Sequence, residues 1–234
     1  MGRRRVRENL SWRIRFRIEK KFNNLAMKMI LNDKEQGKVS TYSEARQDRF
    51  VIKMTNEKKH GTYVEIGSGH PIRSNNTFLL ESKYRWLGIS VELNSELVRE
   101  FRGARLNPVI AADATSLNYR KLFSEFNLPG LIDYLQIDID PALQSLEALK
   151  KIPFEKYKFS VITFEHDRYR ANRQIARDSR KLLKSFGYKL IVKNVKSQKL
   201  KPFEDWWIHP ELIEKNVWMQ FKSHRKNPFS LKWN

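Results

Sequence analysis

The chain has 234 residues, which is enough for one domain with a full hydrophobic core and short extensions. It contains no cysteine, which excludes a disulfide framework and a thiolate metal site, and no stretch approaches the ~20 apolar residues of a membrane-spanning helix. Its formal net charge is +20. The charged N-terminus has no apolar segment behind it, so we expect no secretory signal and a cytoplasmic protein, with peripheral membrane association as an open alternative.

The positive charge lies at the two ends of the chain. Residues 1–60 contain 17 Lys/Arg and 7 Asp/Glu, residues 61–165 contain 12 and 13, and residues 166–234 contain 17 and 6. This segregation indicates an anionic partner, such as nucleic acid, an acidic membrane surface or a phosphorylated substrate. A solvated basic surface without a partner is the alternative.

Residues 1–40 are predicted to form a basic amphipathic extension. A stripe that includes Leu10, Ile14 and Ile18 has helical spacing and predicts a helix over about 11–31, although the alternation of apolar residues with arginines also fits a strand. Such a helix packs on the neighbouring domain, or it lies on a membrane or on RNA.

Residues 61–69, GTYVEIGSG, read as a short buried strand followed by a glycine turn. A strand that ends in a glycine turn is how doubly wound α/β domains build a nucleotide-binding crevice. A dinucleotide fingerprint would need a third Gly or Ala where Ile72 stands. The Glu-x-Gly-x-Gly spacing is instead similar to the turn of class I S-adenosylmethionine (SAM) methyltransferases, which surrounds the methionine part of the cofactor. The residues that this similarity assigns to SAM are Glu65, Gly67, Ser68 and Gly69.

Several short motifs follow one another in a fixed order. They are YSEARQDRFV at 42–51, NNTFLLE at 75–81, WLGISVE at 86–92, IDYLQIDID at 132–140, FEH at 164–166, GY at 187–188 and EDWW at 204–207. In this order they resemble FkbM-type methyltransferases, whose members act mainly on hydroxyls of sugars, glycans and secondary metabolites. Asp140-Pro141-Ala142-Leu143 and Gln136 depart from the family pattern, which has a Glu-Gly-Ala-Glu type sequence and commonly Lys there.

The resemblance implies a Rossmann-like class I methyltransferase fold over residues 41–210. Its seven-stranded, mostly parallel sheet would have an antiparallel last strand and helices on both faces, and Asn76 would contact the cofactor. Residues 1–40 would be the N-terminal extension, and residues 211–234 would be a basic, aromatic C-terminal tail.

Two acids that follow predicted strands are candidates for SAM binding. Glu92 ends a strand at 85–91, where a carboxylate can accept both ribose hydroxyls; a helix cap or a solvated loop acid is the alternative. Asp113 follows a strand at 108–111, where it can accept the adenine amino group while Ala114 leaves room for the ring. A simple turn Asp is the alternative there.

A predicted strand at 131–139 brings Asp138 and Asp140 to the carboxyl edge of the sheet, where α/β sheets hold their reacting groups. Asp140 followed by Pro141 also reads as the N-cap and first residue of a helix. Because that structural role explains Asp140 and none explains Asp138, Asp138 is the first catalytic candidate and Asp140 the weaker one.

The next strand, at 159–164, ends in Glu165 and His166, which are also catalytic candidates. Hydroxyl methylation needs a base, which Asp138 or His166 can provide, or a divalent ion that lowers the pKa of the hydroxyl. Asp138 and Glu165 are candidate ligands for Mg²⁺ or Mn²⁺. The alternatives are carboxylates that only hydrogen-bond a polar substrate and a structural histidine.

A helix predicted over 169–186 has an apolar inner face and a basic outer stripe. Arg168 and Arg170 lie near its start, where they are candidates to hold a phosphate or carboxylate of the substrate. The tail mixes aromatic and basic residues, a pattern typical of single-stranded nucleic acid binders, although docking of the tail on the domain is the commoner outcome.

Three functions fit these observations. The first is a SAM-dependent O-methyltransferase acting on a sugar, a glycan or a related polar acceptor. The second is an RNA-directed enzyme, for example one methylating a ribose 2′-hydroxyl, which the basic flanks favour. The third is a non-catalytic binding module with the same fold.

Overall fold

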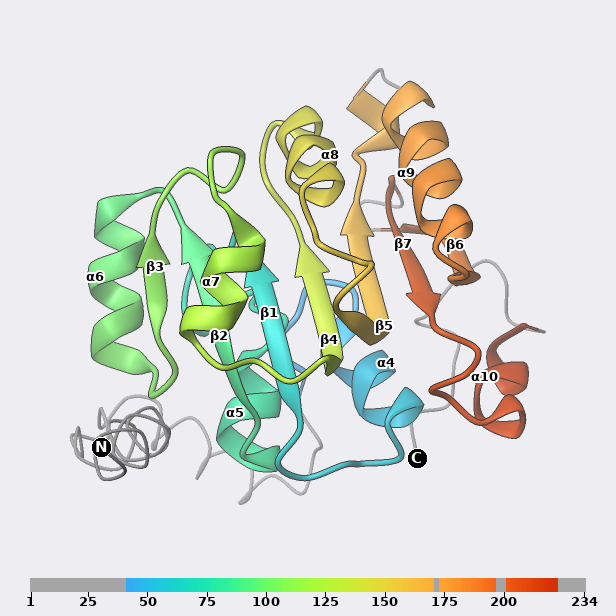
Figure 1. The fold of residues 1–234 in the computed structure, drawn as a ribbon, viewed down its shortest axis with the longest axis horizontal. Helices are drawn as coiled ribbons and strands as arrows, with labels where there is room; N and C mark the ends of the chain where they lie inside the picture. The colour runs from blue at the N-terminus through green and yellow to red at the C-terminus, as the bar shows by residue number, and fades with distance from the viewer. Residues whose placement is uncertain (1–40, 171–172, 197–200, 223–234) are drawn as a thin grey trace, which may run out of the picture.

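The computed structural model describes residues 41–170, 173–196 and 201–222. The helix predicted over about 11–31 and the end of the tail therefore lie outside the described residues. A seven-stranded sheet with the order β3-β2-β1-β4-β5-β7-β6 forms the centre (Figure 1). Its strands are β1 (Thr62–Ile66), β2 (Leu87–Glu92), β3 (Val109–Ala111), β4 (Leu131–Ile137), β5 (Lys158–Glu165), β6 (Lys189–Lys196) and β7 (Pro202–Ile208).

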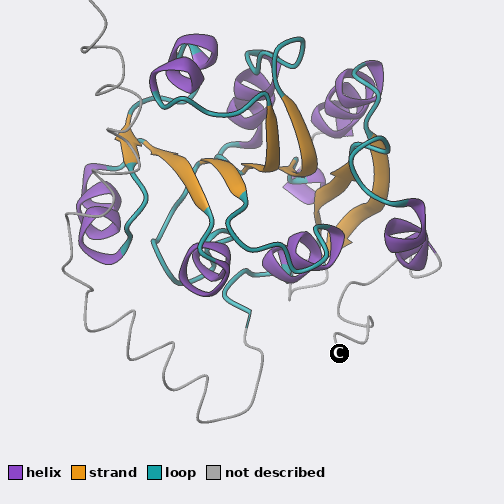
Figure 2. Ribbon diagram, turned by 60° about the horizontal axis from the view of Figure 1, so that its bottom comes forward, coloured by secondary structure: helices purple, strands orange, loops and turns teal. Residues whose placement is uncertain are grey.

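Strand β7 runs antiparallel to both of its neighbours, β5 and β6, whereas the remaining pairs are parallel. The central strands β1 and β5 are buried along most of their length because helices cover both faces of the sheet (Figure 2). These findings confirm the predicted Rossmann-like methyltransferase architecture. The helices are α4 (Gln47–Met54), α5 (Phe78–Tyr84), α6 (Ser95–Ala104), α7 (Tyr119–Glu125), α8 (Ala142–Lys150), α9 (Arg173–Ser185) and α10 (Lys215–Lys222), with a 3-10 turn η1 (Arg168–Arg170).

Two hydrophobic clusters fill the space on the two sides of the sheet. Residues of α7, α8 and α9 pack in one cluster, and residues of α4, α5 and α10 pack in the other. Trp206 and Trp207 of β7 are both fully buried, one in each cluster, because successive side chains of a strand point to opposite faces. Within the described ranges no helix is both long and apolar enough to cross a membrane.

The first part of the C-terminal tail docks on the domain. Helix α10 contributes Trp218 and Phe221 to the second cluster, and each is 4% exposed. Phe221 contacts Phe50 edge-on, and Lys189 Nζ lies 4.3 Å from the centre of the Trp218 ring. The docking alternative is therefore confirmed for α10, and these two aromatic rings are not available for stacking on nucleic acid.

The helices that follow β4 and β5 begin later than the sequence predicts. Helix α8 starts at Ala142 with Pro141 in the N-cap position and no side-chain cap, so the prediction of Asp140 as the N-cap is wrong. The Ser145 hydroxyl instead accepts from the backbone N–H of Ile139, at 2.8 Å, and closes this turn from inside the helix. Similarly, the segment predicted as one helix from 169 begins with η1, and α9 starts at Arg173.

Candidate functional site

The parallel strands end at one edge of the sheet, the upper edge in Figure 1, and the predicted site residues follow these ends. The glycine turn follows β1, Glu92 ends β2, Asp138 follows β4 and Glu165 ends β5. In the sheet register Ile66 pairs with both Val91 and Ile137, so the three loops emerge side by side. The carboxyl edge of such a sheet is where α/β proteins bind their ligands.

The two glycines of the turn have different roles. Both have positive φ, 77° at Gly67 and 58° at Gly69, and the N–H groups of Gly67 and Ser68 donate to the carbonyl of Val91. A Cβ at Gly67 would overlap the backbone carbonyl of Asp138, whereas a Cβ at Gly69 would meet no atom within 4 Å. Gly67 is therefore required by the close approach of the chain after β4, and only Gly69 faces open space.

Glu92 links the first two loops of the site. One carboxylate oxygen accepts the N–H of Gly69 at 2.9 Å, and the other accepts the N–H of Asn94 at 2.8 Å. Asn94 itself caps α6, since its side chain accepts the N–H groups at the start of that helix. Glu92 thus does not act as the helix cap, and each of its oxygens keeps a lone pair for a further donor.

Two buried polar atoms near the turn have no hydrogen-bond partner within the described part of the chain. They are Ser68 Oγ and Asn76 Oδ1, in side chains that are almost fully buried. Asn75, next to Asn76, donates to the carbonyl of Ser68 at 3.1 Å and so connects the two segments. Buried polar atoms are nearly always satisfied in native proteins, so these two are candidates for contact with a polar ligand at this loop.

The Glu65 side chain lies beneath the turn in a buried network. It accepts hydrogen bonds from Ser90 Oγ at 2.7 Å, Thr77 Oγ1 at 2.9 Å and Asn75 Nδ2 at 3.1 Å. Burial raises the pKa of Glu65 to about 7. Both carboxyl oxygens are engaged inside the protein, so Glu65 supports the turn, and the contact with SAM expected for its side chain is not part of this arrangement.

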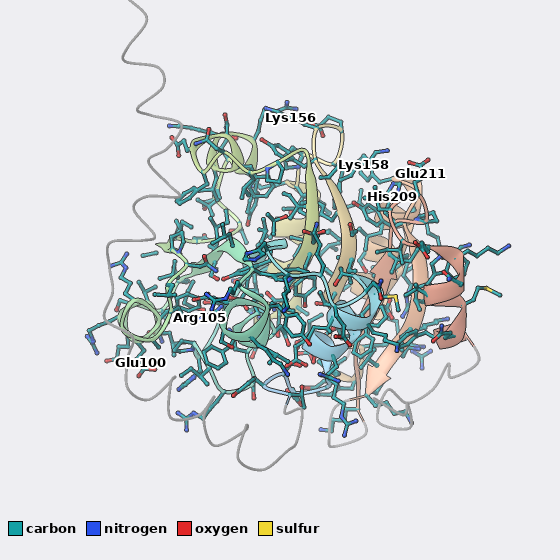
Figure 3. All side chains as sticks on the ribbon, turned by 90° about the horizontal axis from the view of Figure 1, so that it is seen from below. Glu100, Arg105, Lys156, Lys158, His209 and Glu211 are labelled. Atoms are coloured by element: carbon teal, nitrogen blue, oxygen red, sulfur yellow. The ribbon has the colours of Figure 1, made fainter. Side chains whose placement is uncertain are left out.

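Arg105, which sequence reasoning missed, holds the same loop from the other side. Its guanidinium donates to the carbonyl of Pro71, to Asn75 Oδ1 and to Thr77 Oγ1, and it forms an ion pair with Glu81 at 2.8 Å. Figure 3 shows Arg105 inside the molecule, near α6 and α5. No local pattern marks this residue, because its hydrogen-bond partners are 24 to 42 positions away in the sequence.

Asp113 and Ala114 follow β3, next to the loop that carries Glu92. Asp113 accepts the N–H and the hydroxyl of Thr115 and the hydroxyl of Ser116, and the hydrogen bonds from Thr115 lower its pKa. Its side chain is exposed and Ala114 is buried. Asp113 therefore stabilises the turn in which it lies, and its binding of the adenine amino group remains a prediction.

Asp138, the first catalytic candidate, forms a hydrogen-bonded carboxyl pair with Glu165. They meet because β4 and β5 are paired up to Ile137 and Phe164, the residues just before them. Burial raises the pKa of Asp138, and burial together with the charge of Asp138 raises the pKa of Glu165 far above its usual range. Glu165 is therefore the protonated member and donates to Asp138.

A third carboxyl group, Glu204 of β7, lies directly opposite Glu165 in the sheet register. It is buried and accepts hydrogen bonds from Gln47 Nε2 at 2.8 Å and from Trp206 Nε1. Burial raises its pKa well above the usual range. Sequence reasoning missed its role because Gln47 lies 157 residues earlier.

His166 is fully buried beneath η1. Its Nδ1 accepts the N–H of Arg168 at 3.2 Å, and its Nε2 lies 3.3 Å from Asp205, which also forms a 2.6 Å ion pair with Arg180. Burial alone would raise the pKa of Asp205, but its contacts with His166 and Arg180 lower it. Both ring nitrogens of His166 thus face protein groups. This arrangement favours the structural role of His166, which holds η1, over a catalytic role.

The remaining candidates lie along the same edge. Asp140 is exposed between β4 and α8. Arg168 and Arg170 form the ends of η1 after β5, and the side chain of Arg170 lies outside the described part of the structure. The Mg²⁺ or Mn²⁺ predicted at Asp138 and Glu165 is not supported. Over the described ranges, no group of three or more His, Asp or Glu side chains is placed to hold a metal ion.

No protein-family model matches the sequence, and no curated protein matches it. Among solved structures, the "putative rRNA-methylase" from Clostridium thermocellum is similar, with a TM-score of 0.51 and 13% identity over 73% of this chain and 97% of that chain. The chain has a class I methyltransferase fold. A TehB-like SAM-dependent methyltransferase from Corynebacterium glutamicum covers 80% of this chain and 97% of its own, with a TM-score of 0.44 and 13% identity. A human methyltransferase 10 domain containing protein is similar over 69% of this chain and 80% of its own, with a TM-score of 0.47 and 11% identity.

Proposed function

We propose that the protein is a SAM-dependent O-methyltransferase that acts on a sugar hydroxyl. The observation that carries this proposal is the loop between β1 and α5, where the unpartnered Ser68 Oγ and Asn76 Oδ1 lie beside a turn that opens at Gly69. When bound, SAM supplies an electrophilic methyl group on its sulfonium. Ser68 and Asn76 would hold its methionine part, Glu92 its ribose and Asp113 with Ala114 its adenine.

Asp138 would act as the general base of the transfer. It takes the proton of the acceptor hydroxyl while the new C–O bond forms and the sulfonium S–C bond breaks, and it later releases this proton to water. Glu165 is a positioning residue, because its O–H donates to Asp138 and favours the ionised form of that carboxyl. Arg168 and Arg170 would hold an anionic group of the acceptor.

The motifs that resemble FkbM-type methyltransferases support this assignment because they meet in space. Gln47 of the first motif donates to Glu204 of the last one, and Phe50 stacks on Trp206 at 4.6 Å. His166 of a third motif faces Asp205. The segments therefore form one connected structure behind the carboxyl pair, which is what a shared family architecture requires.

Calorimetric titration of SAM into the full chain tests the proposal. We expect a Kd in the micromolar range, and we expect Glu92→Ala to weaken binding roughly 10- to 100-fold, since it removes a charged acceptor of hydrogen bonds. Glu96→Ala, which removes an exposed acid in the first turn of α6, is the matched control and should bind normally. Failure of the folded, unsubstituted protein to bind SAM would overturn the proposed function.

A further inference from the structure

Helix α9 presents an exposed row of four cations, which we call the α9 stripe. Its members are Arg173, Arg177, Lys181 and Lys184. Residues three or four apart on a helix lie about 5–6 Å apart along one face, so the stripe is a nearly evenly spaced line of positive charge. The opposite face of α9 is buried against the sheet, through Ile175, Ala176, Ser179 and Leu183.

The cations of the stripe differ from two cations on α7 and α8, which have acidic partners. Lys121 of α7 lies 3.8 Å from Glu125, and Lys150 of α8 lies 2.8 Å from Glu147. None of the stripe residues forms an ion pair with another described residue. The single acid of α9, Asp178, accepts a hydrogen bond from Gln174 at 2.7 Å.

The stripe begins at the candidate active site. Helix α9 follows β5 and η1, so its first turn lies at the carboxyl edge of the sheet and its axis runs away from that edge (Figure 1). In η1, Tyr169 is 36% exposed, and Lys201 Nζ lies 4.9 Å from the centre of its ring. The Tyr169 ring and the Lys201 ammonium group therefore lie near the end of the α9 stripe that is closest to the candidate site.

We propose that the α9 stripe is the docking surface for single-stranded RNA, which is the acceptor of the methyl group. This inference rests on the proposed function and names its substrate class. Evenly spaced cations are complementary to a polymer with one phosphate per unit, and Tyr169 provides a ring on which a base can stack. The ribose of RNA supplies the hydroxyl that the reaction needs.

An acidic membrane is the competing anionic partner, and the structure disfavours it. Helices that lie on membranes insert an apolar face between the lipids. The apolar residues of α9 are buried in the core of the domain, so this helix offers a membrane only charge.

Fluorescence anisotropy with a labelled single-stranded RNA of about 20 nucleotides tests the proposal on the full chain. The variant Arg177→Ala/Lys181→Ala removes two charges from the stripe. Lys121→Ala/Lys150→Ala removes two charges from α7 and α8, so it has the same net charge and serves as the matched control. At ~0.1 M salt, two lost phosphate contacts correspond to roughly 25-fold weaker binding, and the salt dependence, log Kd against log salt, should become less steep by ~1.4.

The inference is supported if the stripe variant shows this loss and the control stays within about threefold of the unsubstituted protein. Equal losses in both variants, no loss in the stripe variant, or binding to phosphatidylserine vesicles without binding to RNA would overturn it. SAM titration of the same proteins separates the two proposals. If the protein binds SAM but not RNA, only the proposal of an RNA-docking surface is refuted. If it binds RNA but not SAM, the proposed methyltransferase function is refuted.

Discussion

Replacing Arg105 by methionine is expected to destabilise the protein and to weaken the cofactor loop. The guanidinium is fully buried and forms an ion pair with Glu81, whose side chain is 8% exposed. Removing one partner of a buried pair leaves the other charge without compensation and costs about 3–5 kcal/mol. The same change also removes the hydrogen bonds that hold Pro71 and Asn75, so we expect weaker binding of SAM as well.

Urea denaturation followed by tryptophan fluorescence measures the first effect, and calorimetry of SAM binding measures the second. Trp218→Ala is the matched control, because it should cost about 3–5 kcal/mol in a different part of the core, within α10. It should leave the affinity for SAM unchanged. The reasoning is refuted if Arg105→Met lowers the free energy of unfolding by less than about 1 kcal/mol, which would be an ordinary surface effect. It is also refuted if the Kd for SAM equals that of the control.

Gly67→Ala should cost about 2–3 kcal/mol in urea denaturation because its Cβ overlaps the backbone, whereas Gly69→Ala should cost only about 1 kcal/mol; equal costs would contradict the assigned roles. Asp138→Asn should lower the rate of methyl transfer from labelled SAM to RNA at least ~100-fold with unchanged SAM affinity, and Glu165→Gln, which keeps a donor toward Asp138, should lower it less than ~10-fold. A larger loss in Glu165→Gln would show that the base is assigned to the wrong carboxyl. Because Glu65 has a pKa of about 7 in the folded protein and 4.5 unfolded, the native state binds the extra proton, and the free energy of unfolding falls as pH rises between these values, by about 3 kcal/mol. Glu65→Gln should remove this part of the pH dependence in denaturation measured across that range.

The sequence predicts the features that depend on neighbouring residues. The strands appear as short apolar runs, and those predicted at 131–139 and 159–164 lie within two residues of the observed β4 and β5 at each end. The short helices α4, α5 and α7 were not assigned, because seven or eight residues give too little periodicity. The start of α8 was misplaced, since Asp140-Pro141 looks like a helix start by composition while the Ser145 hydroxyl closes the turn instead.

The parts of the site that were missed depend on buried polar partners far apart in the sequence. Arg105 has no recognisable motif, and its role is defined only by the loop and helix that fold around it. Likewise Gln47 and Glu204 belong to motifs at opposite ends of the domain, and only the closed sheet makes them partners. Sequence reasoning identified Glu165 as a neighbour of Asp138, but the proton that they share results from burial, which a sequence does not specify.

The raised pKa values at the carboxyl edge also bear on the proposed acceptor. Three ionised carboxylates would repel the phosphates of RNA from the end of the α9 stripe. Burial raises the pKa of Asp138, Glu165 and Glu204, and in the carboxyl pair Glu165 keeps its proton. Buried Glu204 favours its neutral form for the same reason, so the cluster carries less negative charge than three ionised carboxylates would, and Asp138 is the member that we propose as the general base. A site with raised carboxyl pKa values, beside cations that form no ion pair with the residues that the structure describes, can therefore accept a polyanion and still remove a proton from its hydroxyl.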